Sequence, residues 1–140
     1  MSKQVVLFAS LGGTSEELAQ KIATSLKIQS ENLNQFDVSS FPNYSLIIFV
    51  VSTYGKGGPP SNCKEIWEAI EKYSTQLPNL KFAVYGVGSS GFEKTFLGFA
   101  KAIENKFKEL GATQIGTLGV LDELEELSTD YDEWIKSVQI

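Results

Sequence analysis

The chain has 140 residues, which suits a single domain spanning residues 1–140, and 42% of them are hydrophobic, enough for a full core. The net charge of −5 argues against nucleic-acid binding, and the absence of histidine and arginine removes the commonest general base, the commonest zinc ligand and the bidentate phosphate clamp. No apolar run reaches membrane-spanning length, the N-terminus has no signal-peptide pattern, and Cys63 has no disulfide partner, so we expect a soluble, cytoplasmic monomer.

The first half of the chain alternates strand and helix patterns. Val5–Ala9 and Leu46–Val51 are continuous apolar runs, typical of strands buried on both faces of a parallel sheet. A polar strand within Glu31–Val38 is predicted for a sheet edge. Thr14 and Glu17 form a capping-box pattern that would start the first helix. The apolar stripe of that helix is Leu18, Ile22, Ala23 and Leu26.

The second half continues the alternation. Phe82–Val87 is a third buried strand, and Gln114–Val120 is a weaker fourth one. Three apolar stripes predict helices, and Gly111 is expected to end the second of them as a C-terminal cap. These stripes are Ile66, Ile70, Tyr73 and Leu77; Phe96, Phe99, Ala100, Ile103, Phe107 and Leu110; and Leu124, Leu127, Tyr131, Trp134, Ile135 and Val138. The alternation predicts an α/β fold with a doubly wound, five-stranded parallel sheet and helices on both faces.

Three loops follow the three strongest strands and should therefore leave the sheet at one edge, where such folds bind ligands. The first is "SLGGTSEE" (10–17), in which hydroxyls and glycines lead directly into a helix N-terminus, a ready anion site. Taken alone, it equally fits a capped helix start that binds nothing.

The other two loops each offer an aromatic ring. "STYGKGGPPSN" (52–62) carries Tyr54, and "YGVGSSGFEKTF" (85–96) carries Phe92. The last loop also contains GxGxxG, but a lone match late in the chain is a weak dinucleotide fingerprint. Two rings near an anion-binding helix start suit a flat aromatic ligand that carries a phosphate. Local packing of each ring remains the alternative.

In order and spacing, the three loops resemble the FMN-binding loops of the flavodoxin family, most closely the flavodoxin-like domain of diflavin reductases in a short-chain form. The resemblance covers essentially the whole chain, and its most specific motif is Thr-Tyr-Gly-x-Gly followed by prolines and Asn. It implies FMN as the cofactor and these contacting positions: Ser10, Leu11, Gly12, Gly13, Thr14, Ser15, Ser52, Thr53, Tyr54, Gly55, Gly57, Gly88, Ser89 and Phe92.

The resemblance also implies individual roles. The first loop would cradle the phosphate with help from Thr53, and Tyr54 and Phe92 would stack on opposite faces of the flavin. The Gly55 carbonyl would turn toward flavin N5 on one-electron reduction, and Gly88 with Ser89 would line the pyrimidine edge. The chain departs from the family pattern at Gly12, which usually is Thr, and at Phe92, which usually is Tyr in the diflavin group.

The expected function is one-electron transfer, through bound FMN, from an NAD(P)H-dependent flavin reductase to a haem or iron–sulfur protein, rather than transformation of a substrate. The acidic segment Asp122–Glu133 holds seven acids and no lysine, and it is either a solvated helix face or a docking surface for these partners. Two rivals stay open: an NAD(P)H:quinone-type flavin reductase, and a module of the same fold that has lost FMN and acts by binding or regulation.

Overall fold

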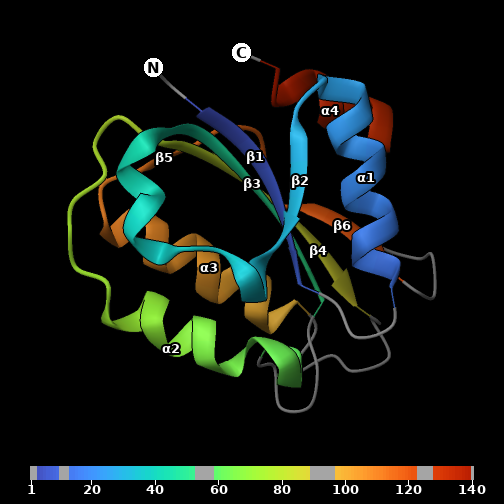
Figure 1. Ribbon diagram of the computed structural model, residues 1–140. Coiled ribbons are helices and arrows are strands. Elements are labelled where there is room, and N and C mark those ends of the chain that lie inside the picture. Colours follow the sequence, from blue (N-terminus) through green and yellow to red (C-terminus); the bar gives the residue numbers. More distant parts are fainter. Residues whose placement is uncertain (1–2, 10–12, 53–58, 89–96, 123–127, 140) are drawn as a thin grey trace.

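Six parallel strands form one sheet in the computed structural model, which describes residues 3–9, 13–52, 59–88, 97–122 and 128–139 (Figure 1). The strands are β1 (Lys3–Ala9), β2 (Gln29–Asn32), β3 (Tyr44–Ser52), β4 (Lys81–Gly88), β5 (Thr113–Gln114) and β6 (Gly119–Asp122). The α-helices are α1 (Thr14–Leu26), α2 (Lys64–Lys72), α3 (Gly98–Glu109) and α4 (Tyr131–Ser137). Three short 3₁₀ helices complete the described elements: η1 (Leu33–Gln35), η2 (Val38–Asn43) and η3 (Ser61–Cys63).

The strand order is β2-β1-β3-β4-β5, with β6 also paired to β4. The direction of winding therefore reverses between β1 and β3, which confirms the predicted doubly wound parallel sheet. The predicted fourth strand, 114–120, is wrong as one element. β5 pairs with the start of β4 and β6 with its end, and Gly116 lies between them with φ +67°, a left-handed conformation that interrupts the strand.

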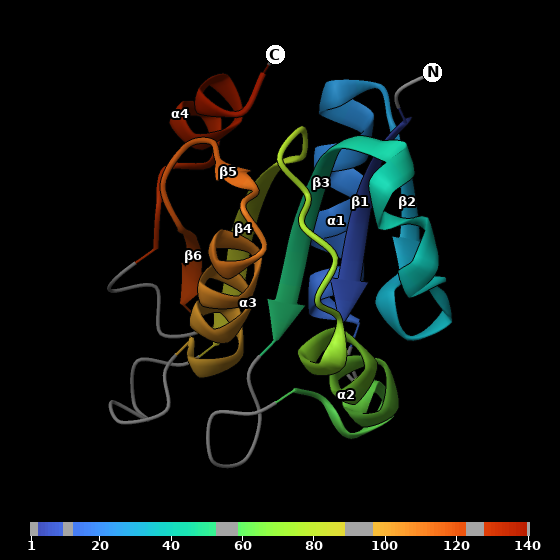
Figure 2. The same cartoon turned by 90° about the vertical axis from the view of Figure 1, so that its left-hand side faces the viewer.

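Two hydrophobic cores lie on opposite faces of the sheet. In Figure 2, α2 and α3 lie in front of the sheet and α1 behind it. Alternate residues of β1 divide between the two cores: Val5 and Leu7 face the α2/α3 layer, whereas Val6 and Phe8 face the α1/α4 layer. Burial on both faces is why the central strands read as continuous apolar runs rather than as alternating ones.

Two predicted elements are shorter than their apolar stripes. α2 ends at Lys72, and Leu77 lies beyond it, where its N–H donates to the carbonyl of Leu110 at 2.7 Å. Pro78 follows and disfavours helical backbone at the preceding residue. α4 begins at Tyr131, with the Asp130 carboxylate accepting from the Glu133 N–H at 3.2 Å, and residues 128–130 before it are not helical. Leu124 and Leu127 of the predicted stripe lie outside the described residues.

The predicted edge strand also differs from the observed one. β2 covers Gln29–Asn32, whereas the prediction placed a strand somewhere within residues 31–38, so only residues 31 and 32 agree. Side chains stop the strand, because Asn32 and Asp37 each accept a hydrogen bond from a backbone N–H two residues later and so begin η1 and η2. The expected glycine cap is confirmed: Gly111 follows α3 with φ +85°.

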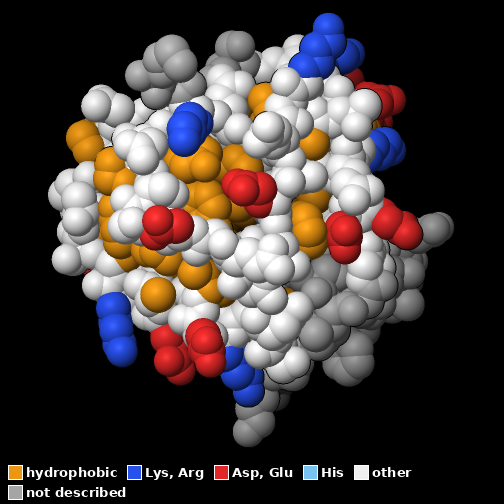
Figure 3. Space-filling view, viewed as in Figure 1, with side chains coloured by type: hydrophobic (Ala, Val, Ile, Leu, Met, Phe, Trp, Pro, Cys, Tyr) orange, Lys and Arg blue, Asp and Glu red, His pale blue; other side chains and the backbone are white. Residues whose placement is uncertain are grey.

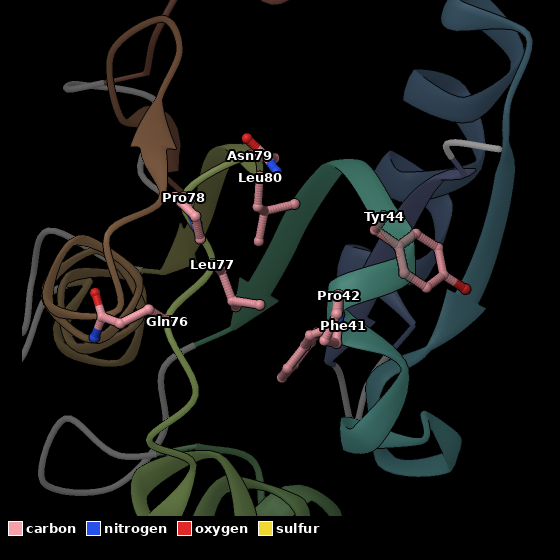
Figure 4. A pocket seen from close by; sticks show the side chains of 8 residues that line it. All are labelled: Phe41, Pro42, Tyr44, Gln76, Leu77, Pro78, Asn79 and Leu80. Atoms are coloured by element: carbon pink, nitrogen blue, oxygen red, sulfur yellow. The ribbon is translucent and has the colours of Figure 1, made fainter.

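A cleft of about 200 Å³ lies at the amino end of the sheet, between η2 and the segment that precedes β4. Hydrophobic side chains gather over this region on the face in Figure 3. Leu77 and Leu80 point into the cleft toward Phe41, and Gln76 points away from it (Figure 4). The residues that line it are Phe41, Pro42, Tyr44, Gln76, Leu77, Pro78, Asn79 and Leu80, which leaves its lining without an ionisable group other than a tyrosine.

Candidate functional site

The carboxyl ends of β1, β3, β4 and β6 meet at the edge of the sheet opposite this cleft. Residues at the ends of neighbouring strands are paired: Ala9 pairs with Val51, Ser52 with Val87, and Gly88 with Asp122. Neighbouring strands lie about 4.8 Å apart. The three loops that the sequence singled out therefore begin at adjacent points of one edge, at the reversal between β1 and β3. We call this edge the carboxyl edge.

The structure describes five of the predicted site residues: Gly13, Thr14, Ser15, Ser52 and Gly88. All five lie at the carboxyl edge, at the start of α1 or at the ends of β3 and β4. The other predicted positions lie outside the described residues, namely Ser10, Leu11, Gly12, Thr53, Tyr54, Gly55, Gly57, Ser89 and Phe92.

α1 starts without the predicted capping box. Gly13 is the N-cap residue with φ +88°, Thr14 is already the first helical residue, and no side chain of the N-cap accepts a hydrogen bond. The first intrahelical bond runs from the Glu17 N–H to the Gly13 carbonyl at 3.0 Å. The N–H groups of a first helical turn have no partner within the helix, so this start keeps its capacity to bind an anion.

Two serine hydroxyls connect this helix start to the neighbouring strand. The Oγ atoms of Ser15, in the first turn of α1, and of Ser52, the last residue of β3, are 2.5 Å apart. Ser15 is 0% exposed and Ser52 is 5% exposed. A buried polar pair at a strand end suits a site that needs hydroxyls held in fixed positions.

Asp122 is the site residue that sequence reasoning missed. It ends β6 and is 1% exposed, and its backbone N–H donates to Ser128 Oγ at 2.9 Å. Ser15, Ser52 and Asp122 are buried among the described residues and are neither aliphatic nor aromatic, and all three lie at the carboxyl edge. The available signal was an acid directly after the apolar end of a predicted strand.

The acidic segment is therefore not one solvated helix face. Asp122 belongs to a strand, residues 128–130 are not helical, and Asp130 caps α4. The first residue of α4 contacts α1, since Tyr131 Oη and Ser25 Oγ are 3.0 Å apart and Lys21 Nζ lies 3.9 Å from the Tyr131 ring centre, and the acids that follow it in the first turn are exposed.

The first glycine of GxGxxG, Gly86, allows close packing between a helix and a strand. A Cβ on Gly86 would lie 2.8 Å from Leu97 Cδ2 and 3.0 Å from Ala100 Cβ, so the absent side chain lets the start of α3 approach β4. Gly88 is buried at the end of β4, next to Asp122, and Gly91 lies outside the described residues.

Cys63 packs in the hydrophobic core of the α2/α3 layer. It is buried and directly precedes α2, and burial raises the pKa of its thiol to about 11. The thiol is therefore protonated at neutral pH and is a poor nucleophile or metal ligand. No group of three or more potential metal-binding acids, cysteines or histidines is found within the described ranges.

Comparison with known proteins agrees with the geometry. A family model described as Flavodoxin matches residues 6–134. NADPH–cytochrome P450 reductase of Rattus norvegicus is 29% identical over 140 residues (93% of this chain, 20% of the relative), and NADPH-dependent diflavin oxidoreductase 1 of Danio rerio is 32% identical over 143 residues (95% and 24%). The solved structure of a mutant flavodoxin from Pseudomonas aeruginosa is 26% identical, with a TM-score of 0.81 and coverage of 96% of this chain and 94% of that one.

The chain belongs to the flavodoxin family. The family and the diflavin relatives point to FMN as its cofactor and support an FMN-based electron carrier. The chain spans only about a fifth to a quarter of the length of the two reductases. Among the helices that the structure describes, none has the length and apolarity needed to cross a membrane.

Proposed function

We propose that this chain is a single FMN-binding domain that carries one electron at a time from an NAD(P)H-dependent flavin reductase to a haem or iron–sulfur protein. The observation that carries the proposal is the gathering of three buried polar side chains, Ser15, Ser52 and Asp122, at the carboxyl edge, beside a helix start whose N-cap residue is Gly13. Such a convergence, at the reversal of a doubly wound sheet, is where these folds bind nucleotides.

The described residues fit the phosphate end of FMN. The first-turn N–H groups of α1 and the positive end of its dipole would face the phosphate, and Thr14 and the one O–H of the Ser15–Ser52 pair that is not used within the pair would supply further donors. No arginine exists in the chain to replace them.

The loop residues would hold the ring system. Tyr54 and Phe92 would stack on its two faces, and the backbones of Gly55, Gly57, Gly88 and Ser89 would approach its edge. Bound FMN would supply reversible one- and two-electron chemistry, and the protein would set its position and its electrostatic surroundings.

The proposed classes of redox partner are supported by the names of two relatives and by the net charge of the chain. Two relatives are named as NADPH-dependent reductases, and one of them is named for a cytochrome, which supports a flavin reductase as donor and a haem protein as acceptor. A chain with a net charge of −5 would favour basic surfaces on both partners. We assign docking to the carboxyl edge, where the cofactor would lie.

The test is an absorption spectrum before and after FMN addition and desalting. We expect retained bands at roughly 370 and 450 nm, the flavin's own absorption. NADPH alone should leave these bands unchanged, whereas NADPH with a catalytic amount of a flavin reductase should bleach them. A protein that retains no FMN would contradict the carrier function, and bleaching by NADPH alone would indicate a quinone-reductase type of enzyme instead.

A further inference from the structure

Ser15 and Ser52 form a buried contact between two segments that are 37 residues apart in sequence. Ser15 lies in the first turn of α1, immediately after the residues proposed to bind the phosphate. Ser52 is the last residue of β3 and immediately precedes Thr53 and Tyr54. The contact therefore joins the start of the phosphate site to the start of the loop that is proposed to hold the flavin ring.

The number of hydroxyl protons limits how many hydrogen bonds the pair can donate to a phosphate. Each serine hydroxyl has one proton and two lone pairs. At an Oγ–Oγ distance of 2.5 Å, one of the two protons is donated within the pair. Only one O–H then remains for any ligand, so the two serines cannot both donate to a phosphate while the contact persists.

We propose that Ser15 and Ser52 are positioning residues: their mutual hydrogen bond fixes the start of the Tyr54 loop relative to the start of α1. Binding of the flavin ring, and not only binding of the phosphate, therefore depends on this bond. Burial protects this bond from competition by water, since the two side chains are 0% and 5% exposed. The inference rests on the proposed FMN function and assigns these serines a role other than phosphate contact alone.

Riboflavin separates the two roles because it has the same ring system as FMN and no phosphate. A hydroxyl that acts only on the phosphate affects FMN affinity and leaves riboflavin affinity unchanged. A hydroxyl that positions the Tyr54 loop affects both. Thr14 provides the matched control, because it belongs to the same helix start but is exposed and is not part of the buried pair.

The experiment measures the dissociation constants of FMN and riboflavin by quenching of flavin fluorescence, for the wild type, Ser15→Ala, Ser52→Ala, the double variant and Thr14→Ala. We expect each serine variant to weaken both ligands by about 2- to 10-fold, the range for one lost hydrogen bond. The double variant should be no weaker than the single ones, because the bond is lost only once. Thr14→Ala should weaken FMN alone.

The double variant also guards against misfolding, since removing both hydroxyls leaves no buried unpaired group, whereas a single substitution leaves one. Ser15→Thr keeps a hydroxyl and should retain most of the riboflavin affinity. Serine variants that weaken FMN but not riboflavin, or losses that multiply in the double variant, would overturn the inference while leaving the carrier function intact. A wild-type protein that binds neither ligand would overturn the proposed function, and the inference with it.

Discussion

The two ends of the sheet differ in what they bury. At the amino end, the cleft beside β3 and β4 has a floor of Phe41, Leu77 and Leu80, each no more than 3% exposed, and its lining carries no carboxylate and no lysine. At the carboxyl edge, Ser15, Ser52 and Asp122 are buried. Burying polar groups costs free energy that burying leucines does not. The amino end therefore contributes mainly to stability, whereas the cost of burying polar groups at the carboxyl edge is explained by function.

The largest expected effect concerns the amino end. Leu80→Ala removes a side chain that is 2% exposed, so we expect the free energy of unfolding of the apoprotein to fall by about 2–5 kcal/mol. Urea denaturation followed by circular dichroism measures this. At low temperature, where the variant is folded, its FMN affinity should equal that of the wild type. A large loss of affinity in the folded variant would break the division between the two ends.

For Tyr54→Ala we expect the opposite pattern, a loss of FMN affinity with little change in stability. We expect FMN affinity to fall by about 1–3 kcal/mol, roughly 5- to 150-fold, because one stacking surface is lost. Unfolding of the apoprotein should change little. Tyr54→Phe is the matched control and should bind nearly as well as the wild type. An unchanged dissociation constant for Tyr54→Ala would show that the Tyr54 ring does not contact the flavin.

Asp122→Asn tests the effect of a negative charge at the carboxyl edge, because it removes the charge and nearly preserves the shape of the side chain. A carboxylate beside Gly88 disfavours the negative charge that a flavin gains on full reduction, so its removal should shift the potential of the last reduction step to a more positive value, on the order of tens of millivolts. Stepwise reduction with reference dyes measures the shift. Asp130→Asn, at the start of α4, is the control and should shift the potential less. Equal shifts would indicate a general surface effect.

The smallest effect belongs to Cys63. Burial raises the pKa of its thiol to about 11, above its ordinary value near 9.0, so the folded state holds the proton more tightly. Its contribution to stability is therefore complete below about pH 9 and is lost as the pH rises toward 11. Urea midpoints across this range should fall more steeply for the wild type than for Cys63→Ala. Parallel curves would show that the thiol does not titrate differently on unfolding.

Much of the fold could be predicted because buried parallel strands leave continuous apolar runs. Leu46–Val51 lies within β3, and Phe82–Val87 lies within β4. Details set by single residues could not be predicted in this way. Gly116 divides the last predicted strand into β5 and β6, and Leu77 extends an apolar stripe beyond the end of α2, because it packs in the core without being helical.

The candidate site was predicted in part for a similar reason. The positions of its loops follow from the strands that precede them, so Ser15, Ser52 and Gly88 were identified correctly as residues of the carboxyl edge. Asp122 was missed because a run of acids resembles a solvated helix when the strand before it is weak. The contact between Ser15 and Ser52 was missed because no local pattern relates residues 37 positions apart.

The most direct test of the central claim is a ¹⁵N–¹H correlation spectrum of the apoprotein titrated with FMN. We predict that the amide signals of Gly13, Ser15, Ser52, Gly88 and Asp122 shift, and that those of Tyr44, Leu77 and Leu80 do not. Shifts confined to the amino-end residues would contradict the account, since they would show that FMN binds at the end of the sheet that we assign to stability.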